Sequence, residues 1–163
     1  MAPSQFWWVQ PAVVLLGILV AVAAIWWNRH VARLKATLDL IEGSESKDFY
    51  QVRYKAFRQY RRDAEYKAQV LSEERDEQAQ DKRTKCLDFL NHYELVAIAC
   101  RAGIIDEKFY MLWMGPALLR DWAEGAELVR GARAPDHPGD PGSPESYAEL
   151  ERLVGRWRGR RLH

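Results

Sequence analysis

Apolar residues are concentrated at the N-terminal end of the chain. Residues 11–27 carry no polar side chain, and between Phe6 and Trp27 only Gln10 interrupts the apolar run. A run of about 22 apolar residues, folded as a helix, can cross the roughly 30 Å hydrocarbon core of a bilayer. Both ends of the run carry paired tryptophans, whose indole rings favour membrane interfaces; they are Trp7, Trp8, Trp26 and Trp27. The pattern therefore predicts a transmembrane anchor over residues 1–28.

Basic residues lie on one side of this segment. No Lys or Arg precedes it, whereas Arg29, Arg33 and Lys35 follow closely. The positive-inside rule then places the N-terminus outside and the rest of the chain in the cytoplasm. A cleaved signal peptide is the alternative, because residues 21–23 (Ala-Val-Ala) resemble a cleavage site. The missing basic n-region, the long apolar run and the basic residues after it favour an uncleaved anchor.

The remaining chain follows a helical period. Apolar residues recur at intervals of three and four, without sustained two-residue alternation. We therefore predict an all-α fold, in which one N-terminal transmembrane helix precedes a small cytoplasmic helical bundle over residues 29–130. The first row of apolar residues at this spacing runs from Val31 to Ile41 and predicts that the anchor helix continues as far as a break at Gly43. After this break, Ser46 is a candidate N-cap for the next helix.

Two segments of this bundle are rich in charge. Residues 47–62 combine aromatic and basic positions, which suits an ordinary amphipathic helix with a solvated basic side or, close to a membrane, a surface for anionic headgroups. Residues 72–85 contain almost nothing apolar, and their acidic part precedes their basic part. That order suits a solvated helix beginning near Ser72, or a charged connector.

Helix boundaries are clearest after the most apolar cytoplasmic stretch. Gly103 is a natural helix stop and Asp106 a natural N-cap for the next helix. The Gly115–Pro116 pair predicts a break or kink in that helix.

A Pro/Gly-rich linker separates the bundle from the C-terminal end. Residues 131–146 have low helical potential. A last helix is expected to begin near Ser143, with Pro144 at its first position, and residues 147–163 form its basic amphipathic body. Such a helix can dock on a membrane surface, on an acidic partner or on its own bundle.

Composition and motifs narrow the chemistry. A formal net charge of +1 gives no indication of a nucleic-acid partner. Cys86 and Cys100 are fourteen residues apart, about 21 Å on one continuous helix, so they cannot form an intrachain disulfide there. Neither a zinc-binding spacing nor a glycine-rich phosphate loop occurs in the sequence. We expect no cofactor, no metal site and no enzymatic activity.

The stretch FLNHYEL, residues 89–95, brings together three residue types that catalysis uses. On a helix Asn91 and Glu94 share a face, whereas His92 lies on the side of Asp88. The three do not converge as one cluster. The favoured interpretation makes Asn91 and Glu94 a buried polar core of the bundle, with an arginine such as Arg101, Arg120, Arg130 or Arg133 as partner of the carboxylate. The alternative is a catalytic site.

Three stretches carry a resemblance to a known family. They are TLDLIEGSESKDFYQVRYKAFRQY, LDFLNHYELVAIACRAGIIDEKFYMLWMGPALLRDW and the arginine at 133. The chain resembles the bacterial domain-of-unknown-function family 4760 over most of residues 10–133. The resemblance implies one N-terminal membrane helix followed by a small helical cytoplasmic part, and no established activity. For a bacterial chain the membrane would be the inner, cytoplasmic one.

These observations favour a membrane-anchored protein-interaction module, acting as an adaptor or accessory subunit of a larger membrane assembly. Expected partners are the lipid bilayer and another membrane protein or a second copy of the chain. Aromatic residues dominate interface hot spots, so the candidate contacts are Trp113, Trp122, Tyr147 and Trp157. The alternative function is a sensor or effector of a bacterial stress or antiphage system.

Overall fold

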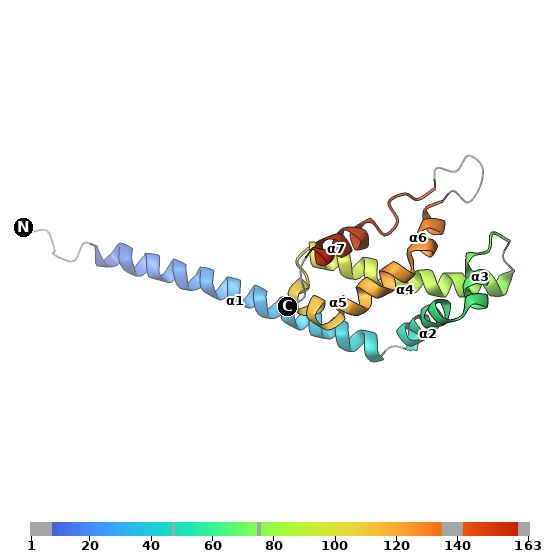
Figure 1. Ribbon diagram of the computed structural model, residues 1–163. Helices are drawn as coiled ribbons and strands as arrows, with labels where there is room; N and C mark the ends of the chain where they lie inside the picture. Colours follow the sequence, from blue (N-terminus) through green and yellow to red (C-terminus); the bar gives the residue numbers. More distant parts are fainter. Residues whose placement is uncertain (1–7, 47, 75, 135–141, 160–163) are drawn as a thin grey trace, which may run out of the picture.

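The computed structural model describes residues 8–46, 48–74, 76–134 and 142–159, and side chains outside 44–50 within these ranges. Over these ranges the chain is helical, which confirms the predicted all-α class. Figure 1 shows a long first helix, α1 (Val9–Ser46), that leaves a bundle of shorter helices and extends alone at its N-terminal half. The bundle contains α2 (Asp48–Arg62), α3 (Ala64–Leu71), α4 (Glu77–Arg101), α5 (Glu107–Glu124), α6 (Ala126–Arg133) and α7 (Ala148–Arg158).

The apolar half of α1 has no packing partner among the described residues. The segment from Val9 to Gly43 has a mean hydropathy of 2.3 over its most apolar window, and none of that window is buried. This helix is long and apolar enough to cross a membrane, and a signal sequence would share these features. Gly43 does not end it, so the predicted break there is wrong and the helix continues to Ser46.

Helix α4 is the central element of the bundle. It packs against α2, α3, α5 and α7. Phe89 stacks on Phe57 of α2 with ring centroids 4.7 Å apart, and Tyr93 meets the edge of Phe89 at 5.0 Å. Leu150, Leu153 and Trp157 of α7 belong to the same buried core. The C-terminal helix therefore packs on its own bundle, which decides between the three alternatives that the sequence left open.

The predicted boundary between α4 and α5 is confirmed. Gly103 has a φ of +65°, and the amide of Ile104 donates to the carbonyl of Ala99 at 3.0 Å, a bond that closes the C-terminal end of α4. The carboxylate of Asp106 accepts from the amide of Phe109 at 2.9 Å and so caps α5. We call residues 102–106 the α4–α5 corner.

Three other predicted boundaries are wrong. Helix α5 continues through Pro116 to Glu124 without a break, because buried residues on both sides of Pro116 outweigh the lost hydrogen bond and the ring clash of a proline. Helix α4 begins at Glu77 with Asp76 as its cap, four residues beyond the predicted Ser72. The last helix begins at Ala148 rather than near Ser143. The predicted N-cap Ser46 is the last residue of α1, and its side chain lies outside the described part.

Helix α1 is fastened to the α4–α5 corner at one polar residue. Thr37 is fully buried, and its hydroxyl donates to the carbonyl of Arg33 at 2.7 Å. The same oxygen accepts from the amide of Asp106 at 2.8 Å. A Cβ added at Gly103 would lie 3.4 Å from the guanidinium of Arg33. Helix α1 is thus joined to the bundle both through the backbone and through the contact of Thr37 with Asp106.

Candidate functional site

Glu94, the acidic residue of FLNHYEL, caps the C-terminal helix. Its carboxylate accepts from the amide of Glu149 at 3.2 Å and from the amide of Leu150 at 2.7 Å. These are the second and third residues of α7, whose own N-cap Tyr147 has a φ of +62° and forms no side-chain cap. A side chain from α4 therefore satisfies amides that the local sequence of α7 leaves unpaired. This arrangement gives Glu94 a structural role.

Three of the four predicted arginine partners of Glu94 bind other carboxylates, and the fourth, Arg130, is exposed on α6. Arg101 pairs with Glu149 at 2.9 Å, Arg120 with Asp121 at 3.3 Å, and Arg133 with Glu151 at 2.7 Å. The partner of Glu94 is the helix backbone, whose N-terminal partial positive charge favours a carboxylate. The prediction of an arginine partner is therefore wrong. Glu94 does make a polar packing contact, but its partner is the backbone of α7.

Asn91 is exposed, so the prediction that it belongs to a buried polar core is wrong. Apolar residues lie on two sides of α4, and the prediction chose the side of Leu87 and Leu90 for Asn91. In the structure Asn91 lines a groove on another side, together with His92. Asn91 and His92 are thus separated from Glu94, which confirms that the three residues form no common cluster.

The groove has a volume of about 710 Å³ and lies between α1, α2, α4 and the α4–α5 corner. Its walls are mostly apolar, and at one end an ion pair joins Arg53 to Asp88 at 3.0 Å. Leu95 in the wall is 65% exposed, so apolar surface faces solvent there. The lining residues are Ala36, Asp39, Leu40, Gly43, Arg53, Asp88, Phe89, Asn91, His92, Leu95, Val96, Ala99, Ile104 and Ile105.

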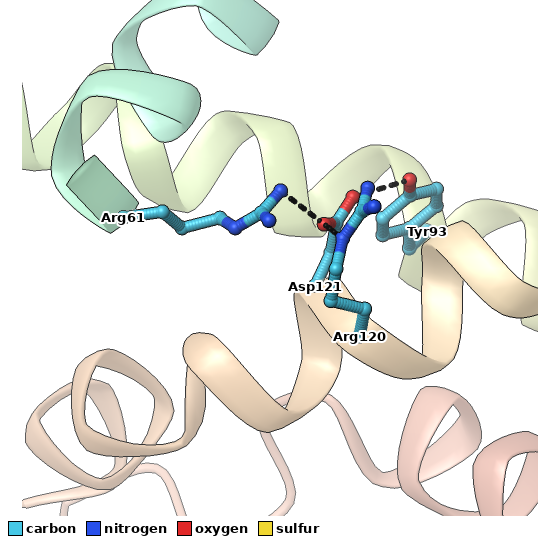
Figure 2. Close-up of polar contacts among 4 residues, drawn as sticks. All are labelled: Arg61, Tyr93, Arg120 and Asp121. Carbon is cyan, nitrogen blue, oxygen red and sulfur yellow. Dashed lines mark hydrogen bonds and ion pairs between the residues drawn. The ribbon is translucent and has the colours of Figure 1, made fainter.

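A buried carboxylate lies at the centre of the bundle and was not singled out from the sequence. Asp121 of α5 is 1% exposed. It accepts from Arg61 of α2 at 2.7 Å and from the hydroxyl of Tyr93 of α4 at 3.1 Å, while Arg120 approaches it at 3.3 Å (Figure 2). The cluster connects three helices. With every acceptor oxygen engaged, it is a structural crosslink and offers no open site for a substrate.

The burial of Arg83 was not predicted, because the sequence places this residue in a charged, solvated segment. It is buried, and its guanidinium donates to the carbonyl of Val70 at 3.3 Å. Near it the hydroxyl of Tyr60 is buried with no hydrogen-bond partner among the described residues. Burial, helped by the charge of Glu127, raises the pKa of Tyr60 to about 12. Arg83 therefore joins α4 to α3, and Tyr60 is a buried packing residue of α2.

The four predicted contact aromatics separate into two groups. Trp113 is 41% exposed on α5 and Trp122 is partly buried. Tyr147 and Trp157 are buried in the core, so their prediction as partner contacts is wrong. The indole N–H of Trp157 donates to Glu107 of α5 at 3.1 Å, so this side chain joins α7 to α5.

The described residues include no candidate metal-binding group, and their two thiols are buried. No group of three His, Cys, Asp or Glu residues among them is placed to hold a metal ion. Cys86 and Cys100 are free thiols, as predicted, and both are buried on α4. Burial raises the pKa of each thiol to about 12, which keeps both protonated near neutral pH.

A family comparison agrees with this plan. The profile of a domain of unknown function, DUF4760, matches residues 11–157. The chain belongs to this family. The match covers both the apolar helix and the bundle, including α7, so it extends beyond the resemblance recognised over residues 10–133. No curated protein and no solved structure matches the chain.

Proposed function

We propose that this DUF4760 protein is a single-pass membrane protein whose cytoplasmic bundle binds another protein through the groove between α1, α2 and α4. Residues 1–28 would anchor it in a bacterial inner membrane with the N-terminus outside. The flanking residues Trp26, Trp27, Arg29 and Arg33 support this orientation, because aromatic rings mark the interface and basic residues favour the cytoplasmic side.

The groove is the observation that carries this proposal. Hydration of a largely apolar cleft with an exposed leucine in its wall is unfavourable, and proteins use such surfaces to bind partners. Its polar lining residues, among them Arg53, Asp88, Asn91 and His92, supply the few directed hydrogen bonds that fix orientation. We infer that the occupant is an amphipathic segment of a partner protein, with its apolar face against Leu95.

The walls of the groove are helices, which suits a recognition surface. Most of the lining residues lie on α1 and α4, and α4 is held by the core on its other sides. Such a surface loses little conformational entropy when a partner binds. A module of this kind would act as an adaptor or accessory subunit.

A transmembrane signalling role is the second candidate, and one observation favours it. Helix α1 passes from the apolar segment into the bundle without interruption and is fastened there by Thr37. A displacement of the anchor would therefore move one wall of the groove. This proposal predicts that Thr37→Val, which removes both hydroxyl bonds, uncouples the effect of the anchor on partner binding.

A pair of matched leucine variants tests the groove. Leu95→Glu places a charge in the groove wall, whereas Leu112→Glu places the same charge on α5, outside the groove, at a leucine that is 73% exposed. Both sites are solvent-exposed, so both variants are expected to melt as the wild type does. Proteins that co-purify in mild detergent would be quantified for all three forms.

The proposal expects Leu95→Glu to lose the partner and Leu112→Glu to keep it. Crosslinking from a photoreactive amino acid at position 95 should give an adduct with the same partner. Equal binding by both variants would refute the groove as the interface. Loss only in Leu112→Glu would move the interface to the exposed face of α5, where Trp113 lies.

A further inference from the structure

We propose that the α4–α5 corner is a second membrane contact, which rests on anionic lipid headgroups beside the anchor. This inference depends on the proposed function, because it requires α1 to span the bilayer. It adds the chemical class of lipid that the bundle recognises and the face by which the bundle meets the membrane.

The position of the corner along α1 carries the argument. Arg33 follows Trp27 by six residues, about 9 Å along a helix. The guanidinium of Arg33 lies against Gly103, and helical side chains project towards the N-terminal turn. Gly103 is therefore at the level of Arg33 or closer to the tryptophans, which themselves sit at headgroup depth. Of the connections between described helices, this corner is the one fastened so near the anchor.

The contacts of Thr37 fix this placement. Its hydroxyl is bonded to the amide of Asp106 at 2.8 Å and is fully buried. Since α1 is one uninterrupted helix up to Ser46, the corner cannot move away from the membrane without breaking that contact or bending the helix. The bundle consequently presents the same end to the bilayer.

The surface chemistry of this end suits a lipid interface. Ile104 of the corner, which also lines the groove, is an apolar side chain that is 58% exposed. Lys108, the second residue of α5, is exposed, and Arg29 and Arg33 are exposed on α1.

The two acidic residues at this end of the bundle, Asp106 and Glu107, make polar contacts inside the bundle. Asp106 accepts from the amide of Phe109, and Glu107 accepts from Trp157 at 3.1 Å and from Arg156 at 3.2 Å. Glu107 is thus paired with a cation, whereas Asp106 and Asp39 keep their charge. The exposed basic residues Arg29, Arg33, Lys35 and Lys108 outnumber these two acids, and anionic headgroups attract basic side chains close to the membrane surface.

Fluorescent probes at two exposed apolar sites test the contact. Ile104→Cys places a thiol at the corner. Val52→Cys places one on α2, which follows the end of α1 about 28 Å beyond Trp27 along the helix. The native thiols Cys86 and Cys100 are buried, so labelling at neutral pH favours the introduced cysteine. Wild-type protein treated in parallel gives the background.

The full-length labelled protein would be reconstituted in vesicles of phosphatidylcholine, with and without phosphatidylglycerol, carrying a headgroup-attached nitroxide quencher. We expect loss of fluorescence at position 104 and little at position 52. The loss at 104 should grow with phosphatidylglycerol and shrink at high salt. Lys108→Gln should weaken the lipid dependence of the 104 probe, whereas Lys55→Gln, an exposed change on α2, should not.

Equal quenching at 104 and 52 in protein that floats with the vesicles would overturn the corner contact and leave the anchor intact. Quenching at 104 that ignores lipid charge would overturn the anionic specificity. Protein that does not float with vesicles would overturn both the anchor and the corner. Ala102→Cys, also exposed at the corner, replaces the first probe if Ile104→Cys does not fold.

Discussion

Replacing Glu94 by alanine removes the cap of α7. Two backbone amides, those of Glu149 and Leu150, then lose their acceptor at the N-terminal end of the helix. A hydrogen bond to a charged group contributes about 1.5–3 kcal/mol, and loss of a helix cap costs about 0.5–2 kcal/mol. Glu94 is half-buried, so water replaces part of the interaction. We therefore expect Glu94→Ala to cost about 2–3 kcal/mol, which lies between the cost of a lost cap and that of two bonds to a charged group.

Thermal unfolding of the full-length protein in detergent, followed by circular dichroism, measures this effect. For a chain of this size about 1 kcal/mol shifts the melting temperature by about 2–4 °C, so a decrease of about 4–12 °C is expected for Glu94→Ala. Glu94→Gln keeps one acceptor oxygen and should lie between the wild type and the alanine variant. Glu124→Ala removes an exposed glutamate on α5 and serves as the matched control, with a change below about 0.5 kcal/mol.

The same variants separate the structural from the catalytic interpretation of FLNHYEL. If Glu94 is a cap, partner binding should fall in proportion to the folded fraction and no further. A Glu94→Gln protein that melts like the wild type yet has lost its biological effect would refute the capping account. It would make Glu94 a reactive residue.

Three further predictions follow from the geometry. Asp121→Ala leaves the guanidinium of Arg61 partly buried without its carboxylate and should cost about 3–5 kcal/mol, measured as a lower denaturation midpoint than that of Glu124→Ala. The thiols of Cys86 and Cys100 have pKa values near 12 in the folded chain, against 9 when unfolded, so the unfolded state loses protons first as pH rises. The stability that the two protonated thiols contribute is complete below pH 9 and is lost between pH 9 and about pH 12, at about 1.4 kcal/mol per pH unit for each thiol. Denaturation midpoints of the wild type and Cys86→Ala, measured at about pH 8 and about pH 10.5, check this prediction. An equal pH dependence of the two proteins would contradict it. A reporter fused after His163 should behave as cytoplasmic, and replacement of Arg29, Arg33 and Lys35 by neutral residues should weaken that preference; a periplasmic signal from the unaltered chain would refute the orientation.

Local signals in the sequence predicted local structure correctly. The apolar run, Gly103 and Asp106 each act through neighbouring residues, so the long first helix and the α4–α5 boundary could be recognised in advance. The Gly115–Pro116 pair failed as a stop, because packing of α5 on both sides of Pro116 outweighs one lost hydrogen bond.

Long-range contacts were the part that the sequence could not supply. Neither the spacing of Asp121 nor its neighbours in the sequence indicate that it is buried. Only the fold brings Arg61, sixty residues away, to its carboxylate. Trp157 and Tyr147 are buried because α7 packs on α4. The composition of the Pro/Gly-rich segment before α7 does not predict where α7 packs. Asn91 was misplaced because α4 carries apolar residues on more than one side, and the helical period alone does not tell which side faces the core.

The anchor is the claim on which the whole account depends, and the intact mass of the membrane-resident protein tests it most directly. Membranes would be washed with alkaline carbonate, and the retained protein would be measured by mass spectrometry. The account predicts that the protein stays in the membrane fraction with the mass of the uncleaved 163-residue sequence, 18.9 kDa. A soluble protein shortened near residues 21–23 would contradict it, because α1 would then be a removed signal sequence.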